Sequence, residues 1–239
     1  MKWYIPREHG GWAMFIVPLI IGLIFSEKNI YHILLFAGAL SGYIATSPLL
    51  SYIRKPKLGK EVLPSLLIFS SASVIFIMPI FVKFPFTVAL FLMIVPFFIV
   101  NLVFAKLKKE RHFINDVFAI CGLSFLILIA FYIGNGEVTR FAITLMFINI
   151  FYFIGTVFHV KTFLRERGNV GFAQLSHIYH GLLLLVPVVI GYPSVALAYA
   201  FSALKTWLIP KHKKIKPLVL GIVEIANSAV FLIVLSIIF

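Results

Sequence analysis

The chain has 239 residues, of which 62% are hydrophobic and only 12% are charged, and its mean hydropathy is +1.06. Eight acidic residues beside 26 Phe cannot supply the polar surface that a soluble domain of this size needs, so composition excludes a soluble globular protein. The net charge of +13 does not indicate a nucleic-acid partner, because no basic, aromatic-rich domain stands outside the apolar stretches. The composition instead indicates a polytopic helical membrane protein surrounded by membrane lipids.

Nine apolar segments follow one another along the chain. Most reach the ~20 residues that a ~30 Å hydrocarbon core requires at ~1.5 Å per residue. The run over 174–209 is too long for one crossing, so the sequence Gly191-Tyr192-Pro193 is predicted to divide it. We therefore expect an all-α bundle of about nine transmembrane helices, forming a single domain over residues 1–239. The predicted spans are 10–26, 29–53, 63–82, 84–106, 113–134, 138–162, 174–190, 192–209 and 217–239.

The cations in the loops predict the orientation of these spans. All Lys and Arg residues except Lys28, Lys83 and Arg140 fall before the first span or near the loops that follow the even-numbered spans. Lys and Arg accumulate on the cytoplasmic side of membrane proteins. The pattern therefore predicts that the N-terminus lies inside and the C-terminus outside.

The first span begins with a charged triplet, Arg7, Glu8 and His9, followed by a glycine pair and Trp12. Most first spans begin with one or two cations that stay among the lipid headgroups. Here a cation, an anion and an imidazole lie within one helical turn of the apolar boundary. We expect these three residues, together with Trp12, to line a site.

Ionisable side chains inside a span cost roughly 2.5–3.5 kcal/mol each and by default face the interior of the bundle. Glu224 is the deepest, about 10 Å of helix beyond Pro217. We expect it to be paired internally or functional. His177 and His180 share a helix face, but the sequence fixes no third ligand, so hydrogen-bonded histidines are favoured over a metal site. The intramembrane candidates are Asp116, His159, His177, His180 and Glu224.

A basic cluster ends the sixth span, where the sequence reads Arg165-Glu-Arg167-Gly168-Asn169. Cations there complement the helix C-terminus, and Gly168 is suited to a C-cap position. Alternatively, Lys161, Arg165 and Arg167 clamp a phosphate-bearing headgroup, since guanidinium groups bind phosphate through two hydrogen bonds. The sequence leaves both interpretations open.

Several of these motifs together resemble the YwiC-like family of integral membrane proteins. They are the first-span sequence from Pro6 to Met14, the segment from Phe163 to Asn169, His180, the segment from Lys216 to Glu224, and Ser228. The resemblance implies a multi-pass protein of the bacterial cell membrane. It assigns no activity.

A more distant similarity is to the UbiA superfamily of membrane prenyltransferases, based on nine spans and a first helix with Arg, Trp12, Pro18 and Gly22. Those enzymes hold a magnesium-bound prenyl diphosphate with two Asp-rich motifs, at the cytoplasmic ends of helices two and six. The corresponding stretches here, 45–54 and 158–167, contain one carboxylate, Glu166. Mg²⁺ needs several carboxylates, so neither Mg²⁺ nor another cofactor or metal site is expected. An enzyme of this kind would be a prenyltransferase-like intramembrane transferase without the usual Asp motifs.

Our leading interpretation is that the protein binds an amphiphile with an anionic head, an isoprenoid or lipid phosphate, in a cytoplasm-facing cavity. Processing of that ligand would need acid–base groups. The alternatives are a small-solute or proton-coupled transporter, with Glu224 and the histidines as a relay, and a non-catalytic assembly factor of a membrane complex. The oligomeric state is left open. Predicted substrate-binding residues are Arg7, Glu8, Trp12, Arg54, Lys161, Arg165, Arg167 and Asn169, and predicted catalytic residues are His9, His159, His180 and Glu224.

Overall fold

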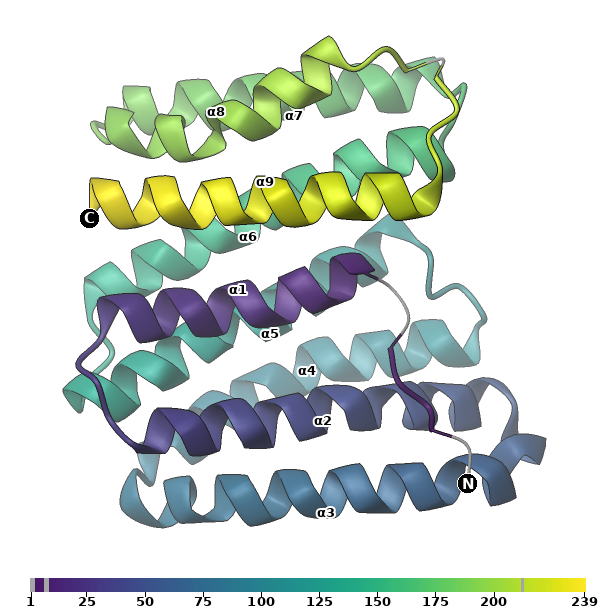
Figure 1. The fold of residues 1–239 in the computed structure, drawn as a ribbon, viewed down its shortest axis with the longest axis vertical. Helices are drawn as coiled ribbons and strands as arrows, with labels where there is room; N and C mark the ends of the chain where they lie inside the picture. The colour runs from purple at the N-terminus through teal and green to yellow at the C-terminus, as the bar shows by residue number, and fades with distance from the viewer. Residues whose placement is uncertain (1–2, 7–8, 212) are drawn as a thin grey trace. The chain divides into compact units, whose positions relative to one another are not determined.

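The computed structural model describes residues 3–6, 9–211 and 213–239, and the side chain of His9 also lies outside the described part. Within these ranges the chain is all-helical, which confirms the predicted fold class, and each predicted span corresponds to one helix (Figure 1). The α-helices are α1 (His9–Phe25), α2 (Tyr31–Arg54), α3 (Gly59–Lys83), α4 (Phe86–Lys106), α5 (Phe113–Asn135), α6 (Arg140–Leu164), α7 (Val170–Val189), α8 (Pro193–Leu208) and α9 (Pro217–Ile238); a 3-10 turn, Pro56–Leu58, precedes α3.

Seven of these helices are long and apolar enough to cross a membrane, counted over the described residues. The other two, α1 and α8, have 17 and 16 residues. At ~1.5 Å per residue each extends only about 25 Å, less than the ~30 Å hydrocarbon core. The predicted division of the long apolar run is correct, because Gly191 takes a positive φ of 87° between the end of α7 and the start of α8 at Pro193.

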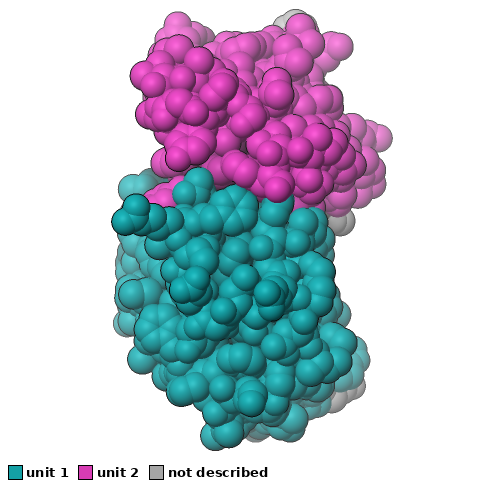
Figure 2. Space-filling model, turned by 90° about the vertical axis from the view of Figure 1, so that its left-hand side faces the viewer, with its two compact units in different colours: residues 1–146 teal, residues 147–239 magenta. Residues whose placement is uncertain are grey.

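The helices group into two compact units, residues 1–146 (unit 1) and residues 147–239 (unit 2), coloured separately in Figure 2. In unit 1, α2 packs on α3, α4 packs on α5, and α1 also packs on α5. A Cβ atom at Gly22 of α1 would lie 2.5 Å from the Cβ of Ala130 in α5. The glycine therefore allows these two helices to approach closely, as small residues do in membrane bundles.

In unit 2, side chains of α7, α8 and α9 contact residues 147–164 of α6. The rings of Tyr152 and Phe231 stack with centroids 3.9 Å apart, and the ring of Tyr199 is nearly parallel to that of Phe231 at 6.3 Å, so α6, α8 and α9 meet at this aromatic stack. Gly155 of α6 faces α7, where an added Cβ would lie 3.3 Å from Nε2 of His180. This close approach brings His180 into the interior of the unit.

Charged residues in unit 2 collect at one end of its helices. All of them lie on the last turns of α6 and α8, the first two turns of α9, or the two loops that connect α6 to α7 and α8 to α9. Among the described residues, the opposite end of the unit has no Lys, Arg, Asp or Glu. We call the charged end the basic end, and its cations are Lys161, Arg165, Arg167, Lys205, Lys211, Lys213, Lys214 and Lys216.

Candidate functional site

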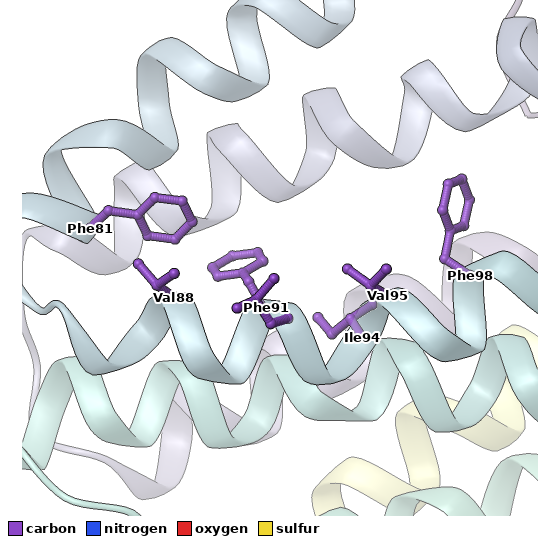
Figure 3. Close-up of a pocket in the computed structure, with 7 residues that line it drawn as sticks. Phe81, Val88, Phe91, Ile94, Val95 and Phe98 are labelled. Atoms are coloured by element: carbon purple, nitrogen blue, oxygen red, sulfur yellow. The ribbon is translucent and has the colours of Figure 1, made fainter.

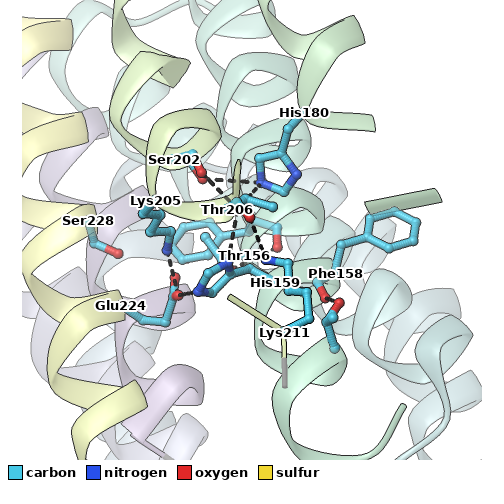
Figure 4. Close-up of polar contacts among 12 residues, drawn as sticks. Thr156, Phe158, His159, His180, Ser202, Lys205, Thr206, Lys211, Glu224 and Ser228 are labelled. Atoms are coloured by element: carbon cyan, nitrogen blue, oxygen red, sulfur yellow. Dashed lines mark hydrogen bonds and ion pairs between the residues drawn. The ribbon is translucent and has the colours of Figure 1, made fainter. Parts of the chain in front are cut away.

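The centre of the candidate site is an ion pair between Lys205 of α8 and Glu224 of α9. The Nζ atom of Lys205 lies 2.5 Å from Oε1 of Glu224 (Figure 4). The two residues are only 6% and 4% exposed. Glu224 is thus paired inside unit 2, one of the two outcomes expected for a carboxylate at this depth, and its partner is a residue that sequence reasoning had not selected.

His159 of α6 connects this ion pair to a hydroxyl group. Its ring is fully buried, with Nε2 at 3.8 Å from Oε1 of Glu224 and Nδ1 at 2.9 Å from Oγ1 of Thr206. One nitrogen of the ring therefore faces a carboxylate and the other faces a hydroxyl group, and imidazole can exchange a proton with the first and form a hydrogen bond with the second.

His180 of α7 completes the chain of polar contacts. Its Nδ1 donates to the backbone carbonyl of Ser176 over 2.7 Å, so in a neutral ring Nε2 is the acceptor. That Nε2 atom lies 3.2 Å from Oγ1 of Thr206 and 3.4 Å from Oγ of Ser202. Thr206 thus bridges two imidazole rings that come from different helices (Figure 4).

We call the resulting set of side chains the polar chain: Lys205, Glu224, His159, Thr206 and His180. Its members come from α6, α7, α8 and α9, and all are buried. Hydrogen bonds join His159, Thr206 and His180, and an ion pair joins Lys205 and Glu224. The 3.8 Å between Nε2 of His159 and Oε1 of Glu224 is too long for a hydrogen bond, so the two parts lie close together without being continuous. Together they can hold a charge that would otherwise be expensive in a membrane interior.

The α8 members were missed at the sequence level, and the spacing of α8 explains how they come together. Ser202, Lys205 and Thr206 lie at i, i+3 and i+4, which places them on one helix face. The predicted place of Lys205 at the end of the eighth span is correct, because it lies in the last turn of α8, but its burial was not predicted. The available signal was its position on the same stripe as Ala198, Tyr199 and Ser202, all of which are buried.

The polar chain lies next to residues of the basic end. Lys161 is buried near the end of α6, whereas Arg165 and Arg167 are exposed in the loop that follows. Lys211 of the α8–α9 loop donates to the backbone carbonyl of Thr206 and lies 4.8 Å from the centre of the Phe163 ring. Burial, together with the nearby charge of Lys205, lowers the pKa of Lys211 to about 8.

Asn169 has a structural task in addition to its predicted role in binding. It is the N-cap of α7, where its Oδ1 accepts from the backbone N–H of Phe172 over 3.1 Å. Its Nδ2 donates to Oε2 of Glu166 over 2.9 Å. Glu166 is thus engaged by an amide and lies beside two arginines in sequence, so these donors do not fit Mg²⁺, which prefers several carboxylate and water oxygens.

The remaining predicted residues belong to unit 1. Arg7 and Glu8, and the side chain of His9, lie outside the described residues. Nε1 of Trp12 donates to the carbonyl of Pro6 over 3.1 Å, and its ring packs edge-on against Tyr43. Arg54 forms an exposed ion pair with Glu110, with Nη1 and Oε1 3.1 Å apart. Of the predicted site, unit 2 therefore joins His159, His180 and Glu224 in one cluster, with Lys161, Arg165, Arg167 and Asn169 at the same end.

Two further features bear on ligand binding. No group of three or more His, Cys, Asp or Glu side chains suited to a metal ion occurs among the described residues. Unit 1 has a shallow groove of about 350 Å³ on α3 and α4, with Phe81, Val88, Phe91 and Phe98 along it (Figure 3). Its lining is entirely apolar, so it has no group that could hold an anionic head.

Comparison with known proteins places the chain in a family. The profile described as YwiC-like protein matches residues 5–132. A protein of Bacillus subtilis (strain 168), described as "Uncharacterized protein YwiC", is 31% identical over 239 residues, which cover 98% of each chain. The chain belongs to the YwiC-like family. A protein of Haemophilus influenzae, described as "Uncharacterized protein", is 30% identical to this YwiC-like chain over 240 residues, again covering 98% of both. No solved structure matches the chain. The chain is thus a multi-pass membrane protein with bacterial relatives.

Proposed function

We propose that this YwiC-like protein binds an amphiphile with an anionic head, an isoprenoid or lipid phosphate, at the basic end of unit 2. The observation that carries the proposal is that every cation of unit 2 lies at one end of its helices, next to the buried polar chain. Arg165 and Arg167 offer planar donor groups suited to phosphate oxygens. By the excess of Lys and Arg, the basic end faces the cytoplasm, so the head would enter from that side of the bacterial cell membrane.

The apolar surface of unit 2 supports a ligand with a long tail. Helix α7 exposes Ile178, Leu182 and Leu185 beyond its basic end. In a membrane these side chains face acyl chains, so a ligand held by its head at the basic end would lay its tail along a surface that is already suited to hydrocarbon.

A stronger form of the proposal adds chemistry to binding. His159, His180 and Glu224 are placed to take up or release a proton, so processing of the bound head would use them as acid–base groups. The similarity of the sequence to the UbiA superfamily favours an isoprenoid tail and a related arrangement of helices. Cationic side chains would then bind the head in place of the magnesium ions that those enzymes use.

The test combines native mass spectrometry of the purified protein with thermal shifts on adding geranyl phosphate, phosphatidic acid or inorganic phosphate. We expect a retained or added amphiphile to stabilise the protein, and the three additions separate a prenyl source, a lipid source and a free phosphate. The double variant Arg165→Glu/Arg167→Glu should lose the shift. Lys55→Glu/Lys57→Glu makes the same change in charge on an exposed loop of unit 1 and should keep it. Absence of any retained ligand and of any shift would refute the proposal.

Proton-coupled transport is the second candidate, and the polar chain is the observation that favours it. A relay through Glu224 and the histidines could serve a coupled solute. The charged groups of unit 2 are confined to one end, however, so they do not continue such a path towards the other. Proton flux into proteoliposomes that stops in Glu224→Gln would support this candidate, and flux that persists in the variant would exclude the relay.

A further inference from the structure

In the Lys205–Glu224 ion pair, the two oxygens of the carboxylate have different surroundings. Oε1 of Glu224 faces both Lys205 and His159, whereas Oε2 is buried without a close hydrogen bond. The buried amide of Asn227, one turn further along α9, acts on the same carboxylate, and its Nδ2 also has no close partner. Nε2 of His159 is likewise buried without a hydrogen-bond partner, 3.8 Å from that carboxylate. Buried polar atoms are nearly always paired, so these two neighbouring atoms mark a point in unit 2 where a further proton or ligand atom can be accommodated.

The charges of the polar chain restrict what can bind there. Lys205 and Glu224 are together neutral. An anionic head that reaches the ammonium group of Lys205 competes with Glu224 for it, and it would leave two negative charges close together in a buried, weakly polar place. Such a pair of like charges repels far more strongly there than in water. A proton on Glu224 removes the repulsion, because the head then replaces the carboxylate as the partner of Lys205.

We infer that binding of the anionic head is coupled to the uptake of one proton by Glu224. The inference rests on the proposed function, which supplies the ligand. Before binding, the buried groups are an ammonium and a carboxylate; afterwards they are an ammonium, a singly charged head and a neutral carboxyl group. The net charge of the buried groups stays at zero, and the proton comes from solvent. No covalent bond other than the new O–H is made or broken.

The charged groups around Glu224 and His159 favour the Glu224 carboxylate over the His159 ring as the final site of the proton. Lys205 from α8 and Lys211 from the following loop already carry positive charge near His159, and a charged imidazole would add a third. His159 is therefore a carrier of the proton rather than its final site. The other titratable side chains around the polar chain are Tyr152 on α6, whose hydroxyl donates to Ser228 of α9, and His177 and Tyr179 on α7.

The polar chain also provides part of a route for the proton, whose last step requires the ring of His159 to move across the 3.8 Å between its Nε2 and Oε1 of Glu224. His159 connects through Thr206 to His180, and the carbonyl of Thr206 accepts from Lys211 at the edge of the basic end. Thr206 is therefore the position where the buried groups and the loop cations meet. A head that draws Lys211 away from that carbonyl would open the same position to water.

Isothermal titration of the full-length protein in detergent tests the inference. The probe is dihexanoyl-phosphatidylglycerol, whose phosphodiester keeps one negative charge throughout, with geranyl methyl phosphate, also a phosphodiester, as the prenyl arm. Binding enthalpies measured in HEPES and in Tris at the same pH report the number of protons exchanged. We expect the uptake of about one proton, and an apparent Kd that rises up to about tenfold per pH unit on the alkaline side.

Two variants separate Glu224 from the other acid of unit 2. Glu224→Gln is permanently neutral and should bind without proton uptake and with a Kd that does not change with pH. Glu166→Gln, the control, should take up the proton as the parent does. If the parent binds either probe without taking up a proton, the inference is wrong while the proposed function stands. If the parent binds neither probe, the proposed function fails and the inference fails with it. A third variant, Lys211→Gln, removes the other group that can gain a proton near pH 8 and should still take up about one proton, so the count on this variant decides the matter even if Glu224→Gln does not fold.

Discussion

The two units differ in the charged side chains that they bury. In unit 1 the helix that packs against both α1 and α4 is α5, whose buried residues are apolar apart from Gly122 and Ser124. In unit 2 the buried face includes His159, Lys205 and Glu224. Among the described residues, buried Lys and Glu side chains occur in unit 2 alone. Although hydropathy is nearly uniform along the chain, the buried charged side chains are thus concentrated in unit 2.

The difference has a physical cause in how each interface is stabilised. Helices in a membrane gain little from the hydrophobic effect, so α1 and α5 rely on the close contact that Gly22 allows. The helices of unit 2 rely on groups that are tolerable only when they are paired with one another. Unit 1 should therefore respond to changes of shape, and unit 2 to the loss of a partner.

The largest expected effect follows from removing Lys205. Lys205→Met leaves Glu224 buried without its cation and should lower the free energy of unfolding by about 3–5 kcal/mol. The double variant Lys205→Met/Glu224→Met should recover most of that loss, because both charges are gone. Reversible unfolding in mixed micelles measures both. Lys213→Met, at an exposed loop position, is the control, and equal stability of the two single variants would contradict the role of the ion pair.

A smaller effect is expected from shape in unit 1. Gly22→Ala places a methyl group 2.5 Å from the Cβ of Ala130, so the helices must separate, at a cost of about 2 kcal/mol. Gly10→Ala in the same helix meets nothing within 4 Å and should be neutral or stabilising by about 0.5–1 kcal/mol. The same unfolding assay compares them. A result in which both variants behave alike would show that α1 does not rely on close contact with α5.

Removing one hydroxyl from the polar chain should cost less. Thr206→Val keeps the shape but breaks the bridge between His159 and His180, and we expect a loss of about 1 kcal/mol. Thr144→Val removes an exposed hydroxyl that bonds only the carbonyl of Arg140 four residues earlier, and it should change little. Should both substitutions prove equally mild, the bridge contributes nothing to stability.

The smallest effect is on the titration of Lys211. Because its pKa is lowered to about 8, the unfolded chain binds more protons above that pH, and this residue makes stability rise as pH increases from about 8 towards the ordinary lysine value of about 10.4. Acylation rates of Lys211, followed by mass spectrometry against exposed Lys213, should show a midpoint near pH 8. In Lys205→Met the midpoint should move upward, since one source of the shift is removed; an unchanged midpoint would assign the whole shift to burial.

The sequence predicted the helices well because each span is apolar over enough residues to require internal hydrogen bonds, and Gly191 with Pro193 marks a turn by local conformation alone. The partnership of Lys205 and Glu224 could not be predicted in the same way. It depends on which face α8 turns towards α9, and no local sequence pattern determines that orientation because a loop separates the two helices. A lysine three residues from a helix end also has the usual position of an exposed cation, so the burial of Lys205 could not be inferred from its place in the span.

The shortness of α8 has a consequence for how the protein is made. With 16 residues and a buried lysine, α8 is a poor candidate for entering the bilayer alone, since a lysine within a span costs roughly 2.5–3.5 kcal/mol. Its carboxylate partner is synthesised 19 residues later. The insertion machinery should therefore hold α8 until α9 emerges and release the two as a hairpin, so that the last helix of the chain decides whether the one before it enters the membrane.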